Sequence, residues 1–323
     1  MASQRIVSIF LLSLAPLLWA PGAKAQAYPD HPVKIIVSVG PTGSYDLVGR
    51  LVAEQLTKRF GQSFVVENRP GAGSIVGTKS VVAAPADGYT LLVGGLSNIV
   101  FNAALYKKLS YDPLKDFVPI ALVFNISYTL VASKNVPYST VKEIIEAAKK
   151  NPGGLKVANA GVGTGQQVVA AAFQAITGTK FLEVPYRGSS LAFTDLLPGR
   201  VDLFFDSTPA AIPYVKSGQA KGIAVLAPKR NPQIPDVPTM TEAGVPGLEI
   251  NSWIGIFARS GTPPAIIARL QKEIAASAPA MAPRLANLGG EAIDIAPEKL
   301  NGFIKADYDK WFKIIKDAGI HLD

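Results

Sequence analysis

The stretch VKIIVSVGPTGSYDLVGRLVAEQLTKRFGQSFVV, residues 33–66, decides the fold class. It opens with an apolar strand, Val33–Val37, passes through a loop over residues 38–45, and enters a helix predicted from Asp46 to Phe60. Gly61 ends that helix, because glycine readily adopts the left-handed conformation that closes many helices. A second apolar strand, FVV, follows at once. Strand, loop, helix and strand in this order predict a sheet whose faces are covered by helices.

The same pattern recurs further along the chain. Thr140 and Glu143 form a capping box, which predicts a helix start because each side chain can bond a backbone N–H of the first turn. Strands that alternate with helices predict mostly parallel sheets, which bind ligands where the strands' carboxyl ends lead into helices. Further strands are predicted at Thr90–Val93, Leu155–Ala158, Phe181–Val184, Val201–Phe205 and Gly222–Leu226, and further helices at Gln166–Thr177, Ser190–Leu197, Ile266–Ala276 and Leu300–Ile315.

The composition excludes several classes of protein. The chain has no cysteine, which rules out disulfides, thiolate metal sites, cysteine nucleophiles and a lipid attached through an N-terminal cysteine. Its two histidines, His31 and His321, lie near the chain ends, which argues against a histidine metal site or a Ser-His triad. The net charge of +8 is spread without a Lys/Arg block, unlike the concentrated patch of a nucleic-acid binder. We therefore expect no catalytic residue, no metal, no cofactor and no nucleic-acid partner.

The N-terminus has the pattern of an export signal. Arg5 precedes an apolar run over Ile6–Ala20, and small residues follow as Ala23-Lys24-Ala25 or Ala25-Gln26-Ala27. A basic start, a short apolar core and an Ala-x-Ala end are typical of a cleaved signal peptide. A membrane anchor is the alternative, but the run of 15 residues is short for a bilayer span. We expect residues 1–25 to be removed and the mature chain to reside in the periplasm of a Gram-negative cell.

Three loops have the composition of an anion-binding site. They are Gly40–Asp46, Asn159–Gln166 and Phe205–Pro209, and each runs from an apolar strand into a helix. Glycines let the backbone approach a ligand, while N–H groups at a helix start and nearby hydroxyls can hold a carboxylate or phosphate. Gly-rich turns also occur for purely structural reasons. The sequence Gly71–Gly77 is such a case, because it has one residue too many for the G-x-G-x-x-G fingerprint of dinucleotide-binding sites.

The ligand-binding set predicted from these loops and their neighbours includes several residues with two interpretations. Asp46 and Asp206 could stabilise helix starts, or could accept a hydrogen bond from a ligand ammonium, hydroxyl or bridging water. Tyr186 could contact ligand or only pack, and Trp253 is expected in the core or between lobes. The predicted set is Thr42, Gly43, Ser44, Tyr45, Asp46, Ser97, Asn98, Gly163, Thr164, Gly165, Gln166, Tyr186, Asp206 and Ser207.

A series of ordered motifs spans the chain from Tyr28 to Ile320. They are Val65–Gly73 (VVENRPGAG), Asp87–Leu92 (DGYTLL), Tyr111–Phe117 (YDPLKDF), Val184–Gly188 (VPYRG), Asp236–Thr239 (DVPT) and Ser252–Gly255 (SWIG). In these motifs the sequence resembles the extracytoplasmic solute receptors of tripartite tricarboxylate transporters, the Bug receptors. The first loop departs from the family pattern, with Thr42 where a glycine is usual and Tyr45 before Asp46. Gln166-Gln167 and Ser207 also differ from the usual residues, so ligand specificity does not transfer from relatives.

The resemblance implies an α/β fold of the periplasmic binding protein type II-like class, with two α/β lobes joined by a two-crossing hinge. It implies lobe 1 from residues 26–128 and 250–323 and lobe 2 from residues 129–249, with crossings near Ser127–Leu130 and Glu249–Ser252. It also implies capture of a small mono-, di- or tricarboxylate through backbone amides, hydroxyls and waters, without an arginine clamp.

The partners implied are two membrane subunits of a secondary transporter, served by a monomeric receptor. A receptor that signals to a membrane sensor is the first alternative, since it would bind its ligand in the same way. An exported hydrolase is the second, but the chain offers no nucleophile paired with a base.

Overall fold

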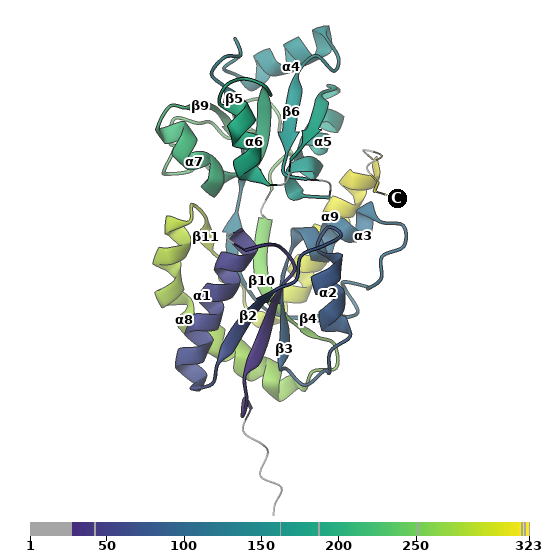
Figure 1. Cartoon of the computed structure of the whole chain (residues 1–323), viewed down its shortest axis with the longest axis vertical. Helices are drawn as coiled ribbons and strands as arrows, with labels where there is room; N and C mark the ends of the chain where they lie inside the picture. Colours follow the sequence, from purple (N-terminus) through teal and green to yellow (C-terminus); the bar gives the residue numbers. More distant parts are fainter. Residues whose placement is uncertain are drawn as a thin grey trace, which may run out of the picture.

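The computed structural model describes residues 28–41, 43–161, 163–186, 188–250, 252–317, 319 and 321–322, and these form two α/β lobes (Figure 1). Lobe 1 is built around a six-stranded sheet of order β11-β4-β10-β3-β1-β2. Its strands are β1 (Val33–Val37), β2 (Phe64–Asn68), β3 (Thr90–Gly95), β4 (Phe117–Ile126), β10 (Ser252–Arg259) and β11 (Glu291–Ala292). Its helices are α1 (Ser44–Phe60), α2 (Ile75–Val82), α3 (Asn102–Leu105), α8 (Pro264–Asn287) and α9 (Leu300–Asp317), with a π-helix over Leu96–Phe101 and a 3-10 helix over Pro297–Lys299.

Lobe 2 is built around a five-stranded sheet of order β7-β6-β8-β5-β9. Its strands are β5 (Tyr128–Ser133), β6 (Lys156–Asn159), β7 (Leu182–Pro185), β8 (Leu203–Ser207) and β9 (Ala220–Val225). Its helices are α4 (Val141–Lys150), α5 (Gly165–Thr177), α6 (Ser189–Leu196) and α7 (Thr208–Lys216). The fold therefore has the expected class, two α/β lobes each with a central sheet.

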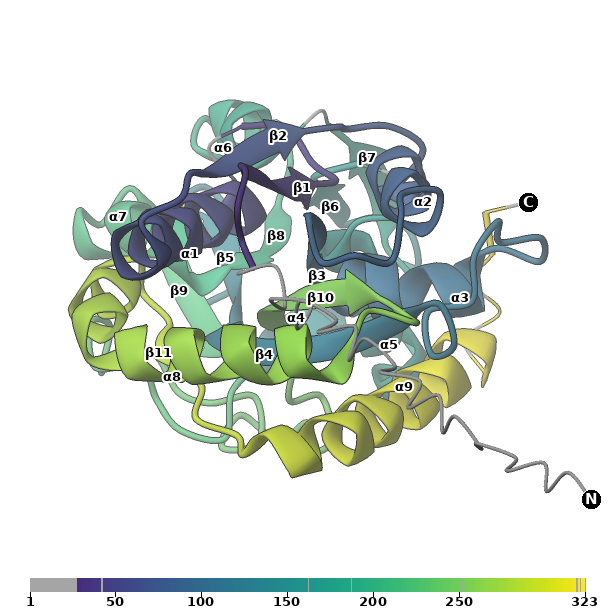
Figure 2. The same cartoon turned by 90° about the horizontal axis from the view of Figure 1, so that it is seen from below.

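Both sheets are buried on two faces, which explains their apolar strands. In lobe 1, Ile35 and Val37 pack into a core beneath α1 and α8, while Ile36 between them packs toward α2 and α9. In lobe 2, Phe204 lies in the core beneath α6 and α7 and its neighbour Phe205 in the core beneath α4 and α5. Alternation with a period of two is what a strand requires when its side chains point to opposite faces. Figure 2 shows helices on both faces of the lobe 1 sheet.

Most strands of each sheet run in one direction, as the alternation of strands and helices predicted, but both sheets are mixed because β10 and β11 in lobe 1 and β5 in lobe 2 are reversed. Strand β1 pairs in parallel with β2 and β3, and β6 with β7 and β8. Strand β10 is antiparallel to β3 and β4, and β5 is antiparallel to β8 and β9. The physical reason lies in the crossings: β5 and β10 enter their sheets from the other lobe. They run away from the boundary between the lobes, whereas their neighbours run toward it.

The chain passes between the lobes at two adjacent places. Ser127 alone separates β4 from β5, and its hydroxyl lies 2.7 Å from that of Thr208 at the start of α7. The return passage follows Ile250, whose N–H still donates to Leu226 in lobe 2, and ends at Ser252, the first residue of β10. Trp253 is buried in the core, one of the two positions expected for it. Its Nε1–H donates to Asp307, which gives the buried indole N–H an acceptor.

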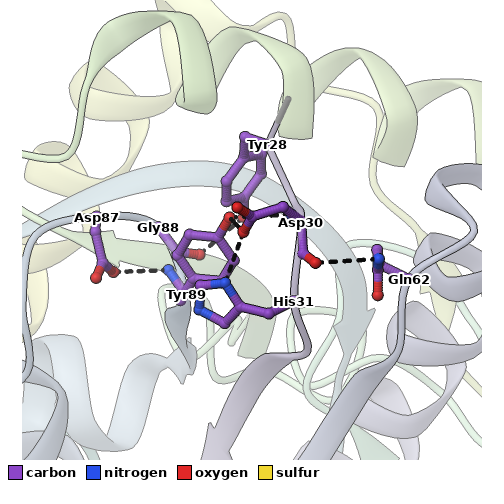
Figure 3. Close-up of polar contacts among 7 residues, drawn as sticks. All are labelled: Tyr28, Asp30, His31, Gln62, Asp87, Gly88 and Tyr89. Carbon is purple, nitrogen blue, oxygen red and sulfur yellow. Dashed lines mark hydrogen bonds and ion pairs between the residues drawn. The ribbon is translucent and has the colours of Figure 1, made fainter. Parts of the chain in front are cut away.

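The start of β1 is tied down at the end of lobe 1 that lies away from lobe 2 (Figure 3). Asp30 accepts from the Tyr89 hydroxyl at 2.6 Å and pairs with His31 Nδ1 at 2.6 Å. The His31 ring stacks on Tyr89 with centroids 3.7 Å apart, and the Tyr28 hydroxyl donates to Gly88 O. These contacts fix the segment before β1, so that β1 itself runs from this end toward lobe 2. The expected signal peptide, residues 1–25, lies outside the described residues.

Candidate functional site

A cavity of about 800 Å³ lies between the two lobes, where the strands end and the helices begin. Lobe 1 supplies the start of α1, the π-helix and the end of α8, while lobe 2 supplies the starts of α5, α6 and α7. None of the described lining residues carries a charged side chain. Nine of the residues predicted from sequence line this cavity: Gly43, Ser44, Tyr45, Ser97, Gly163, Thr164, Gly165, Gln166 and Ser207.

The lobe 1 wall is formed by the start of α1. The first hydrogen bond of the helix is donated by Leu47 N–H to Gly43 O, so the N–H groups ahead of it have no partner within the helix. The Tyr45 hydroxyl accepts from Ser97 N–H at 3.3 Å, and a further hydrogen bond joins it to the Ser97 side chain. Burial raises the pKa of Tyr45 to about 12, so the hydroxyl is protonated at neutral pH. This wall therefore offers hydrogen-bond donors to a ligand.

The lobe 2 wall begins with the start of α5. Val168 N–H donates to Thr164 O as the first bond of the helix, which leaves the N–H groups of Gly165 and Gln166 without an intrahelical partner. The Thr164 hydroxyl donates to Gly161 O at 2.6 Å. Its proton is thus used within the loop, and only its lone pairs remain for a ligand.

Asp206 lies directly behind this wall and not on it. Its side chain is fully buried, and its Oδ1 accepts from Gln166 Nε2 at 3.0 Å and from Ser189 Oγ at 2.8 Å. Its Oδ2 has no hydrogen-bond partner among the described residues. Burial raises the pKa of Asp206 to about 6, and the hydrogen bonds from Gln166 and Ser189 offset part of that rise.

Three other predicted residues also lie outside the lining, each held by its own lobe. Asp46 accepts from Arg50 Nε and from Asn68 Nδ2, both at 2.9 Å. Asn98 is fully buried, and its side chain accepts from Gly95 N–H and donates within lobe 1. Tyr186 donates its hydroxyl to Asp195 on α6. This geometry favours a supporting role for each of them. The remaining predicted residue, Thr42, lies outside the described residues.

Sequence reasoning missed several lining residues. Ser189 and Ser190 begin α6, the helix that follows β7. The rule that ligands bind where a strand leads into a helix, which predicted the other three loops, could therefore have found them. Tyr128 and Ser252 line the cavity from the two crossings, and a hydrogen bond joins the Ser252 side chain to the Tyr128 hydroxyl. Asn287 comes from the end of α8, where no sequence pattern signals a site.

Two lobes that enclose an uncharged cavity with helix starts in its lining, beside paired crossings, define a solute-binding receptor. The chain belongs to the family of tripartite tricarboxylate transporter receptors, whose family model matches residues 48–320. Receptors of this family are periplasmic and bind solutes. In the residues that the structure describes, no helix is both long enough and apolar enough to cross a membrane.

Three relatives are similar to the chain over nearly its whole length. It is 31% identical to BugT of Bordetella pertussis, with 100% of each chain covered. It is 32% identical to Rpa4515 of R. palustris, solved with adipate, with 91% of this chain and 100% of that chain covered and a TM-score of 0.83. It is also 32% identical to MatC of Rhodopseudomonas palustris, solved with bound malate, with 89% and 100% covered and a TM-score of 0.80.

Proposed function

We propose that this receptor captures a small organic anion with one to three carboxylates in the cavity between its lobes. The observation that carries the proposal is the pairing of an uncharged lining with several helix starts that face one space. Unpartnered N–H groups at a helix start attract anions through hydrogen bonds and the helix dipole. Helices α1, α5 and α6 each bring such a start to the lining, so carboxylates can be held from both lobes without a cationic side chain.

The size of the cavity and the ligands of relatives support the same chemistry. A space of about 800 Å³ is within the range of small-molecule sites and accommodates a di- or tricarboxylate. Two similar proteins were solved with adipate and malate, both dicarboxylates. The receptor acts as a monomer that releases its solute unchanged to two membrane subunits of a secondary transporter. It does so in the periplasm, after removal of residues 1–25.

Titration calorimetry with a panel of mono-, di- and tricarboxylates tests the proposal, with the uncharged diamides of the same acids as controls. We expect at least one carboxylate to bind and its diamide not to bind. Nuclear magnetic resonance of the ligand after incubation should show it unchanged. Failure of the whole panel to bind would contradict the proposal, and turnover of a bound acid would contradict the receptor role.

A variant pair locates the binding site. Tyr45→Phe removes a hydroxyl that can donate to the ligand, and a hydrogen bond to a charged group is worth about 1.5–3 kcal/mol, or roughly 10- to 150-fold in affinity. Tyr214→Phe makes the same change on α7, at a residue outside the lining. Equal affinities for the two variants would place the anion elsewhere.

A further inference from the structure

The start of α6 combines unpartnered donors with an unusual hydroxyl. The first hydrogen bond of the helix is donated by Ala192 N–H to Gly188 O, so Ser189, Ser190 and Leu191 keep N–H groups with no intrahelical partner. All three residues line the cavity. A carboxylate placed here would accept from these N–H groups, and its neighbouring atoms would then lie against the Ser189 side chain.

The Ser189 hydroxyl cannot donate to such a ligand while Asp206 is ionised. A serine hydroxyl has one proton and two lone pairs, and an ionised carboxylate only accepts. The proton of Ser189 Oγ therefore lies in the 2.8 Å bond to Asp206 Oδ1, and the lone pairs of Oγ are what remain for the cavity. Gln166 gives one of its two amide protons to the same carboxylate oxygen.

The neighbouring loop repeats this arrangement. The Thr164 hydroxyl gives its proton to Gly161 O at 2.6 Å, so it also turns lone pairs to the cavity. On the opposite wall the Tyr45 hydroxyl accepts from Ser97 N–H and is also hydrogen-bonded to the Ser97 side chain. The lobe 2 wall thus combines two kinds of group: N–H donors at the helix starts and hydroxyl acceptors beside them.

We propose that Asp206 is a positioning residue that sets ligand specificity by turning Ser189 into a hydrogen-bond acceptor. The ligand class that fits is a carboxylate with a hydroxyl or ammonium group on an adjacent carbon, its carboxylate at the start of α6 and its donor on Ser189 Oγ. This inference rests on the proposed function and narrows it. An unsubstituted acid would leave Ser189 Oγ without a donor once the cavity is shielded from water, and an unmade hydrogen bond of a buried acceptor is costly.

Calorimetry with matched acids tests the inference: succinate against malate and aspartate, and glutarate against 2-hydroxyglutarate. The measurements are made at pH 7.5, above the raised pKa of Asp206 of about 6, so that its carboxyl is ionised. We expect a substituted acid to bind roughly 3- to 10-fold more tightly than its unsubstituted partner, the range of one neutral hydrogen bond. Ser189→Ala should bring that ratio close to one, because it removes both the hydrogen bond of the substituted acid and the unsatisfied acceptor that the unsubstituted acid would face.

Three further variants separate positioning from a general structural effect. Ser189→Thr keeps a hydroxyl and should restore the ratio, and Thr194→Ala, which removes an exposed hydroxyl of the same helix outside the lining, should leave it unchanged. Asp206→Leu frees the Ser189 proton, so that the hydroxyl can donate to an unsubstituted acid as well as accept from a substituted one, and this variant should lower the ratio. If Asp206→Leu does not fold, Asp206→Ala, which also removes the carboxylate and introduces a smaller side chain, takes its place. Binding with no preference for substituted acids, or a preference that survives Ser189→Ala, would overturn this inference while leaving the proposed function intact. Absence of binding by every acid would instead defeat the proposed function.

Discussion

A Cβ atom on Gly165 would stand 2.0 Å from the hydroxyl oxygen of Tyr128. Gly165 is the first residue of α5 and Tyr128 the first residue of β5, so the start of one cavity helix rests directly on a crossing between the lobes. Tyr128 is only 6% exposed and cannot turn aside into solvent. The absence of a side chain at Gly165 is therefore a steric requirement.

Gly165→Ala should destabilise the protein by about 1–3 kcal/mol, the usual cost of overpacking, and should weaken carboxylate binding. The matched control is Gly302→Ala on α9, where a new Cβ would meet no atom within 4 Å. That change should be neutral or stabilising by up to about 1 kcal/mol, because alanine favours a helix over glycine. Urea unfolding measures both, and equal stabilities for the two variants would contradict the steric argument.

Asp206 should make the stability of the protein depend on pH. The pKa of Asp206 in the folded protein, about 6, lies above the usual value for an aspartate. The contribution of Asp206 to the free energy of unfolding is therefore fully present below about pH 4 and is lost as pH rises through 6. Asparagine does not titrate, so the Asp206→Asn variant lacks this loss of stability. The variant should therefore become more stable relative to the wild type as pH rises from 4 to 7. The full gain is at most roughly 3 kcal/mol.

Asp195 provides a control of opposite sign. Arg200 and Tyr186 hydrogen-bond its carboxyl and lower its pKa, so its contribution is present at neutral pH and is lost as pH falls through the folded pKa. Asp195→Asn should therefore lose stability relative to the wild type as pH rises. Melting temperatures recorded across pH 3–7.5 for both variants test the two signs, and curves parallel to the wild type would refute them.

Asp46→Asn should separate support of the α1 start from ligand contact. The Asp46 carboxylate joins Arg50 to Asn68 at the end of β2, and Asn68 also donates to Val39 O in the first loop. We expect the variant to lose about 0.5–2 kcal/mol of stability, and its carboxylate affinity to change less than threefold. The reverse result, lower affinity at unchanged stability, would show that this carboxylate acts on the ligand through bridging water.

The lobes should close when ligand binds. The walls of the cavity belong to different lobes, and only Ser127 and the passage between Ile250 and Ser252 connect the chain across them. Such a connection permits hinge motion about a few residues. Solution scattering should show a smaller radius of gyration with a saturating carboxylate than with its non-binding diamide. An identical radius in both solutions would count against closure.

The mature chain should begin at Gln26 or Tyr28. Mass spectrometry of the periplasmic fraction identifies the first residue. Ala25 belongs to both Ala-x-Ala sites, so Ala25→Asp should block processing, whereas Ala27→Asp should still permit cleavage before Gln26. Recovery of functional periplasmic protein that retains Met1 would refute the prediction.

Local sequence patterns predicted the elements well where local chemistry decides them. The strand expected at Val33–Val37 is β1, and the capping box of α4 forms with both of its hydrogen bonds, between Thr140 and Glu143. The helix expected from Asp46 starts two residues earlier, at Ser44, because Gly43 serves as its N-cap. The reversed direction of β5 and β10 was not predictable in this way, because both strands take it from the crossings.

The site residues show the same contrast between those that a local sequence pattern signals and those that the path of the chain brings to the cavity. Strand ends that lead into Gly-rich helix starts are visible in sequence, and they yielded Gly43–Tyr45 and Gly163–Gln166. Tyr128 reaches the cavity only through the path of the chain between the lobes. The hydrogen bonds that Gln166 and Ser189 donate to Asp206 join three separate elements. No local sequence pattern could therefore predict that the Ser189 and Gln166 protons point toward Asp206.

The contacts among Tyr28, Asp30, His31 and Tyr89 fix the start of β1 at the end of lobe 1 away from the cavity (Figure 3). Strand β1 then runs toward the cavity, and the loop that follows it lines the opening. A receptor coupled to a chip at its N-terminal side would accordingly stand with lobe 2 toward the solution and with the cavity between the lobes held clear of the surface. This polarity makes the N-terminal side the natural position for a surface linker or fluorophore in a carboxylate sensor built from this chain.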